Sequence, residues 1–176
     1  KGCRDRALLL IGFAGAFRRS ELVGLSVGDL EFVDRGLIVQ LRRSKTDQEG
    51  VGRKVGIPFA RGSVCPVGAV KGWLAASGII EGPLFRPITR HGHVGQARLS
   101  GHAVAQIVKT CAAAAGLDAT KYSGHSLRAG LITSAAILGV SIWKIKAQSG
   151  HRTDAMVSRY VRDADLFTDN AVGAIL

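Results

Sequence analysis

Apolar side chains recur at intervals of three and four residues along most of the chain, the spacing that places them on one face of an α-helix. In the stretch 5–16, for example, Leu8, Leu9 and Phe13 fall on one such face. Glycines follow several of these stretches, as they do at the ends of helices. The pattern predicts a first helix over 5–16 and a second over 20–25, with Ser20 as its cap. Further helices are predicted over 66–77, 100–115, 126–138, 141–149, 153–162 and 165–175.

Three short runs with a different pattern interrupt the helices in the N-terminal third and read as strands, over 30–33, 37–41 and 54–58. Residues 34–36 form a tight turn between the first two, and the polar stretch 44–52 connects the last two. Consecutive strands joined in this way pair antiparallel. We therefore expect an α+β fold, mostly α-helical, with a small three-stranded antiparallel sheet near the N-terminal third. Residues 82–96 are predicted to be an irregular linker, and 1–176 to form a single domain.

The charge balance indicates a polyanionic partner. The chain has 24 Lys and Arg against 13 Asp and Glu, a formal net charge of +11. Aromatic residues make up 6%, too few for a platform that stacks the bases of single strands, so we expect double-stranded DNA. Three widely spaced cysteines predict neither a disulfide framework nor a zinc site. No apolar run has the length of a membrane span, and no signal peptide is visible.

Two short motifs place cations where an anion would bind. His125 and Arg128 share one face at the start of a predicted helix, and a helix N-terminus attracts phosphate. Arg18 stands at the end of an apolar helix, with Glu21 close enough in sequence to hold its guanidinium. Each motif also has an ordinary structural explanation, as a capped helix or an ion pair.

Two further motifs supply a lysine and a tyrosine. The basic run Arg42-Arg43-Ser44-Lys45-Thr46 puts Lys45 at the tip of the predicted hairpin. His151 follows the glycine that ends a helix, and Tyr160 lies on the next predicted helix. A tyrosine hydroxyl ordinarily has a pKa near 10, so it becomes a nucleophile only when cations stabilise its anion. The structural alternatives are a solvated basic turn and a core tyrosine.

Taken together and in order, these motifs resemble the catalytic domain of the tyrosine recombinases, the phage integrase family, from Asp5 to about Arg162. The resemblance assigns Glu21 a supporting role and implies six catalytic residues: Arg18, Lys45, His125, Arg128, His151 and Tyr160. It also implies that cleavage leaves the 3′ phosphate on the tyrosine and a free 5′ hydroxyl, with strands exchanged in pairs through a Holliday junction.

The residue types fit this chemistry on their own. Arg18 and Arg128 can grip the non-bridging oxygens of a phosphate in its transition state, and His151 can add a donor. Lys45 can protonate the leaving oxygen, and His125 can take the tyrosine proton or bind the phosphate. Cationic side chains thereby replace a metal ion, so we expect no metal and no cofactor.

The resemblance also suggests how the protein is organised. Basic residues near the motifs are expected to contact DNA: Arg19, Arg42, Arg43, Arg90 and Arg152. The chain opens with Lys1 and has Met156 as its one methionine, so we expect a missing N-terminal core-binding domain. Residues 164–176 are expected to pack on a neighbouring protomer of a homotetramer assembled on paired DNA sites. The expected location is the bacterial cytoplasm, at the nucleoid.

Three alternatives remain at this point. A type IB topoisomerase uses much the same chemistry as a monomer, and a regulator could keep the fold without catalysis. The presence of all six catalytic residue types disfavours the regulator. A metal site built from His91, His93 and His102 is disfavoured because their spacing suits neither a helix nor a turn.

Overall fold

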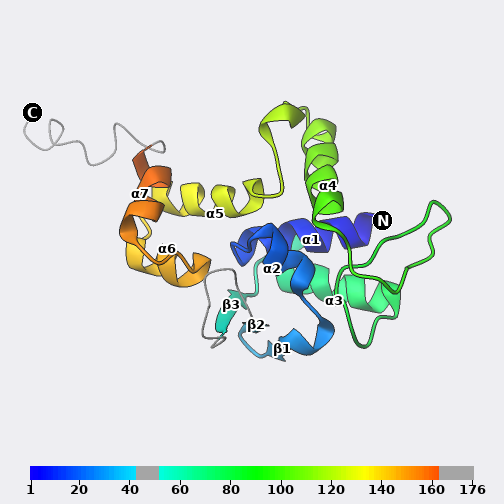
Figure 1. The fold of residues 1–176 in the computed structure, drawn as a ribbon. Helices are drawn as coiled ribbons and strands as arrows, with labels where there is room; N and C mark the ends of the chain where they lie inside the picture. The colour runs from blue at the N-terminus through cyan, green and yellow to red at the C-terminus, as the bar shows by residue number, and fades with distance from the viewer. Residues whose placement is uncertain (43–51, 163–176) are drawn as a thin grey trace, which may run out of the picture.

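The computed structural model describes residues 1–42 and 52–162 (Figure 1). In chain order the elements are α1 (Gly2–Ala14), α2 (Arg19–Gly24), β1 (Leu30–Val33), β2 (Gly36–Leu41), β3 (Arg53–Pro58), α3 (Pro66–Ser77), α4 (Gly101–Ala114), α5 (Ser126–Ile137), α6 (Ile142–Ser149) and α7 (Asp154–Arg162). Short 3₁₀ turns occur at Val27–Asp29, Gly62–Val64 and Ala119–Lys121. The predicted fold class, mostly α-helical with one small sheet, is confirmed.

The three strands form an antiparallel sheet in sequence order, β1-β2-β3. Leu30 lies opposite Val39 in the first pair, and Leu41 lies opposite Arg53 in the second. The tight turn before β2 depends on Gly36, whose φ is +148°. A Cβ at this position would lie 2.2 Å from the carbonyl oxygen of Ile57, so a side chain does not fit there. Gly36 therefore lets the backbones of β2 and β3 approach closely at this end of the sheet.

The buried side chains fall into two groups. The larger core joins α1, α2, the sheet, α3 and α4, and includes Leu8, Phe17 and Leu37. The smaller one joins Ile132 of α5, Ile145 of α6 and Val157 of α7. Figure 1 shows α5, α6 and α7 together at one end of the molecule, away from α3 and α4. Helices α6 and α7 therefore pack on α5, which itself joins the main core through Leu127.

The junction between the first two helices differs from the prediction. The first helix ends at Ala14 instead of residue 16, and Arg18 rather than Ser20 caps α2. Ala16 has a φ of +48°, which reverses the chain. Glu21 then accepts the backbone N–H of Arg18 at 2.8 Å, a bond that closes the start of α2. Arg18 consequently lies at the beginning of a helix and not at the end of one.

One further predicted segment is confirmed, and two lie outside the described residues. Residues 82–96 form the irregular linker that was predicted, with isolated bridges from Ser26 to Pro83 and from Ile88 to Val94. The predicted helix over 165–175 and nearly all of the turn over 44–52 lie outside the described residues. Within the described ranges, no helix is both long and apolar enough to span a bilayer.

Candidate active site

Arg18 and Glu21 form an ion pair where the chain enters α2. Nη1 of Arg18 lies 2.6 Å from Oε1 of Glu21. The Glu21 side chain is 2% exposed and that of Arg18 17%. A carboxylate this buried holds its partner guanidinium in one orientation, because losing the pair would leave an uncompensated charge out of water.

Arg128 lies in the first turn of α5 and is buried. Its Nη1 donates to the carbonyl oxygens of Ala16, at 2.7 Å, and Ser149, at 2.6 Å. The guanidinium therefore joins the loop before α2 to the end of α6. Burial, with a further contribution from the charge of Arg18, lowers the pKa of Arg128 to about 10. Arg128 still carries its charge at neutral pH and is therefore a buried cation.

His151 follows α6 and contacts Arg128. Ser149 Oγ donates to the carbonyl of Ile145 at 2.7 Å and lies 2.8 Å from Nδ1 of His151. Because the single hydroxyl proton is used in the first bond, the serine oxygen accepts from Nδ1–H. That assignment leaves Nε2 to accept from Nη2 of Arg128, 3.1 Å away. The network therefore favours a neutral imidazole with a fixed tautomer.

Electrostatics keep His151 neutral. Burial, followed by the charges of Arg128, Arg18 and Arg53, lowers its pKa to about 4. Bound phosphate would bring negative charge to these cations and raise the pKa of His151 again. The imidazole is thus an acceptor in the free protein and becomes easier to protonate when an anion arrives.

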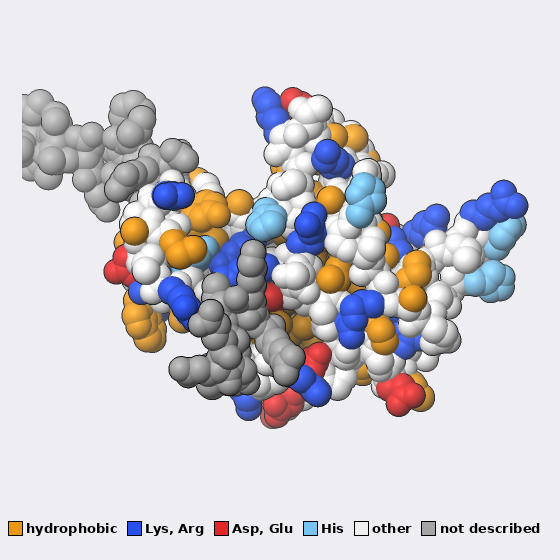
Figure 2. Space-filling model, in the orientation of Figure 1, with side chains coloured by type: hydrophobic (Ala, Val, Ile, Leu, Met, Phe, Trp, Pro, Cys, Tyr) orange, Lys and Arg blue, Asp and Glu red, His pale blue; other side chains and the backbone are white. Residues whose placement is uncertain are grey.

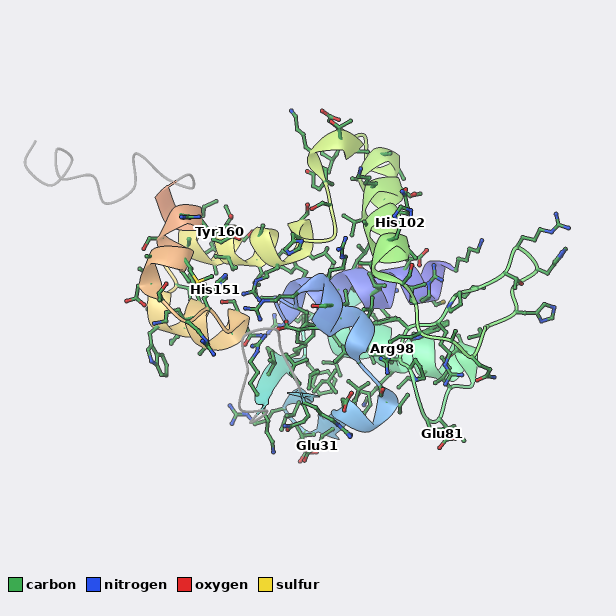
Figure 3. All side chains as sticks on the ribbon, in the orientation of Figure 1. Glu31, Glu81, Arg98, His102, His151 and Tyr160 are labelled. Atoms are coloured by element: carbon green, nitrogen blue, oxygen red, sulfur yellow. The ribbon has the colours of Figure 1, made fainter. Side chains whose placement is uncertain are left out.

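Tyr160 lies on α7, next to His151. The two ring centroids are 6.1 Å apart, and Tyr160 is half-buried against the small cluster of α5–α7. Figure 3 shows both labelled side chains where α6 and α7 meet α5. A pocket of about 340 Å³ is lined by His151, Met156, Arg159 and Tyr160. The tyrosine ring therefore lies beside His151, at the edge of the arginine and histidine cluster.

The half-buried, neutral His151 predicts a specific dependence of stability on pH. With a folded pKa of about 4 against an ordinary value near 6.5, the unfolded chain takes up a proton first as the pH falls. The free energy of unfolding should therefore decrease between pH 6.5 and pH 4. Urea titrations across this range would measure the slope.

The variant H151Q provides the comparison, because carboxylates also titrate in this range. Its free energy of unfolding should depend less steeply on pH than that of the wild type. An NMR titration that places the pKa of His151 at or above 6.5 would contradict this prediction.

The structure brings together four of the predicted catalytic residues: Arg18, Arg128, His151 and Tyr160. His125 immediately precedes α5 and its side chain is exposed. Among the described residues, no hydrogen bond or ion pair is made by the His125 imidazole. Lys45 lies outside the described residues, so its predicted place at the site is untested.

The residues predicted to contact DNA are dispersed. Arg19 lies against two glycines, since a Cβ at Gly124 would come within 2.6 Å of its Cδ. Arg42 is exposed and pairs with Asp29 at 2.7 Å. Arg90 donates a hydrogen bond to His91 on the linker between α3 and α4. Arg152 is exposed directly after His151, and Arg43 lies outside the described residues. Figure 2 shows further Lys and Arg side chains spread over this face.

Sequence reasoning missed three residues that support the site. Arg53 of β3 donates to the carbonyl of Gln148 at 2.8 Å and lies 3.6 Å from Glu21. Gln148 Nε2 donates to the carbonyl of Ala14 at 2.8 Å. Ser149 fixes the His151 ring. Ser149 and Gln148 directly precede the Gly-His motif, a position that could have drawn notice, whereas no spacing rule marks Arg53.

Comparisons with known proteins agree with this geometry. An integrase/recombinase xerD homolog from Selenomonas ruminantium is 45% identical over 172 residues, which are 97% of this chain and 50% of that protein. The chain thus spans half the length of this relative. The structure of XerA recombinase has a TM-score of 0.70 at 20% identity, covering 98% of this chain and 55% of that one. The structure of XerH recombinase bound to a palindromic difH substrate also has a TM-score of 0.70, at 18% identity. The match covers 93% of this chain and 43% of that one.

The two structures show a shared fold, and the curated relative shows common descent over almost the whole chain. The sequence model of the phage integrase family matches residues 1–166. The chain therefore belongs to the phage integrase family.

Proposed function

We propose that this chain is the catalytic domain of a site-specific recombinase that breaks and rejoins double-stranded DNA through a 3′-phosphotyrosine on Tyr160. The observation that carries the proposal is the meeting of Arg18, Arg128 and His151 beside Tyr160. Family membership and the naming of the Selenomonas relative as an integrase/recombinase support it. DNA in the XerH structure supports a DNA substrate.

Cleavage begins when the Tyr160 oxygen attacks the phosphorus of a DNA phosphodiester. The new P–O bond to tyrosine forms as the bond to the 5′ oxygen breaks. Arg18 and Arg128 balance the charge that develops on the non-bridging oxygens. The tyrosine proton passes to His125 as the base, and the 5′ oxygen takes a proton from Lys45. The phosphotyrosine retains the energy of the phosphodiester, so a 5′ hydroxyl can reverse the step.

The role of Lys45 as the acid is testable with a modified leaving group. K45A should slow cleavage of ordinary DNA by about 100-fold or more, because a 5′ alkoxide leaves poorly without a proton. A substrate with sulfur in place of the bridging 5′ oxygen needs no proton, so K45A should cleave it at nearly the wild-type rate. Single-turnover rates on both substrates would show this. Equal defects on both would assign the acid elsewhere, with Lys54 the next candidate.

A type IB topoisomerase would perform the same cleavage without exchanging strands. Two duplexes that carry the protein's own site distinguish these activities. The proposed function predicts recombinant products from the pair. Relaxation of supercoils without recombinants would favour the topoisomerase instead, and binding without cleavage would favour a regulator.

We also propose a homotetramer on paired sites at the nucleoid, in which residues 164–176 pack on a neighbouring protomer. This segment contains five large apolar residues: Leu166, Phe167, Val172, Ile175 and Leu176. The junction of α5 and α6 exposes an apolar surface that could receive them, where Leu138 is 80% exposed and Trp143 74%. Ile137, Val140 and Ile142 extend this surface.

Deleting residues 164–176 should leave folding and binding to a single site nearly intact but abolish recombination, because the protomers no longer hold one another. Trp143→Ser should weaken assembly in the same way while keeping the tail. Circular dichroism, gel shift and recombination assays would separate these effects. An unfolded deletion variant would instead show that the tail packs within its own chain.

A further inference from the structure

Arg53 lies at the start of β3 and reaches two parts of the site that are distant in sequence. Its Nη1 donates to the backbone carbonyl of Gln148 at 2.8 Å, at the end of α6. Its Nη2 lies 3.6 Å from Oε2 of Glu21, the carboxylate whose other oxygen holds Arg18. Within the described structure, Nε and Nη2 are buried and make no hydrogen bond.

Arg53 also lies against the glycine before His151. A Cβ at Gly150 would lie 2.8 Å from Nε of Arg53. Gly150 has a φ of +69°, so the backbone and the packing both require glycine at this position. The guanidinium therefore touches the turn that aims the imidazole.

Helices α6 and α7, which flank His151, are attached to the main body largely through polar contacts. Their apolar side chains pack in the small cluster with α5. Gln148 Nε2 donates to the carbonyls of Ala14, at 2.8 Å, and Gly56, at 3.2 Å. Arg53, which lies on β3 like Gly56, adds its bond to the carbonyl of Gln148. Because polar contacts require defined geometry, they fix the position of α6 more strictly than apolar packing would.

We propose, on the basis of the proposed function, that Arg53 is a positioning residue for DNA cleavage. It contacts Glu21, which holds Arg18. It also contacts Gln148 and Gly150, which precede His151, and so it fixes the position of Arg18 relative to His151. Its fork of donors spans both anchors, which a lysine ammonium cannot do from one point. The cost of keeping a third arginine beside Arg18 and Arg128 is visible in its pKa, which burial lowers. Bound phosphate would balance this group of cations.

The test compares R53M and R53K with R35M in the intact protein. Arg35 is an exposed residue in the β1–β2 turn, at the opposite end of the sheet, so R35M removes the same charge without touching the site. The measurements are the single-turnover rate of covalent adduct formation at saturating DNA, and DNA affinity in a Tyr160→Phe background. Thermal unfolding and an NMR titration of His151 complete the set. Arg18, Arg128, Glu21 and Arg53 are the charged groups that act on that imidazole.

A positioning role predicts that R53M lowers the adduct rate by about 100-fold, as small misplacements of reacting groups do, with little change in DNA affinity. R53K, which keeps the buried charge, should regain only a small part of the rate. The pKa of His151 should rise in R53M and not in R35M, because Arg53 contributes to lowering it.

The proposal is overturned if R53M cleaves like R35M, or if R53K restores the full rate, since charge alone would then suffice. It is also overturned if rate and DNA affinity fall together in R53K, which would indicate general loss of structure. If R53M does not fold, the R53K result decides alone. Absence of any adduct with the wild-type protein would refute the proposed function itself, so the two failures are distinguishable.

Discussion

Replacing Tyr160 with phenylalanine should abolish the covalent protein–DNA adduct on a nicked suicide substrate. The change removes only the hydroxyl, and the other hydroxyl beside His151, that of Ser149, is fully buried and donates to the carbonyl of Ile145. DNA affinity should hardly change, because the phosphate is held by cations and not by the tyrosine. Denaturing gels of the trapped reaction measure the adduct, and gel shifts measure the affinity.

Tyr122 is the matched control, since the chain has two tyrosines. It lies after the 3₁₀ turn Ala119–Lys121, before α5, and outside the cluster of Arg128, His151 and Tyr160. Tyr122→Phe should therefore still form the adduct. An adduct from Tyr160→Phe together with none from Tyr122→Phe would overturn the assignment of the nucleophile.

The second large effect is expected at Arg128. R128K keeps a positive charge, but a single ammonium cannot bond the Ala16 and Ser149 carbonyls and also face His151 as the planar guanidinium does. We expect the adduct rate to fall by about 100- to 1,000-fold, the effect of losing a donor that stabilises the transition state. Single-turnover rates at saturating DNA would measure this loss separately from binding.

Arg61 offers a control for the same substitution. It is exposed after β3, so R61K should cleave at the wild-type rate. Wild-type cleavage by R128K would contradict the role given to Arg128, because it would mean that any buried cation serves.

Much of the fold could be predicted because its signals are local. Helical and strand periodicities located the described elements to within a few residues, and the turn before Gly36 was visible as a turn sequence. The motif of His125 and Arg128 was found because its spacing fits one turn of helix. The spacing correctly places His125 one helical turn from Arg128. It does not predict that the His125 side chain is exposed, as the structure shows.

The remaining features depend on contacts between distant segments. Arg53 meets Gln148 only because β3 packs beside the end of α6, and neither local sequence contains that information. Arg18 looked like the end of a helix, because the apolar pattern continues past Ala14, and only the reversal at Ala16 and the bond to Glu21 make it a cap. Ser149 is marked in the sequence only by its place before the Gly-His motif, because its bond to His151 depends on the three-dimensional position of the ring.

The most direct test of the central claim is to locate the phosphodiester on the protein. The intact protein is trapped on a nicked suicide substrate, the DNA is digested to a short remnant, and peptides are sequenced by mass spectrometry. The proposed function predicts one modified peptide, with a nucleotide joined through its 3′ phosphate to Tyr160. A remnant on any other residue, or one joined through a 5′ phosphate, would contradict it.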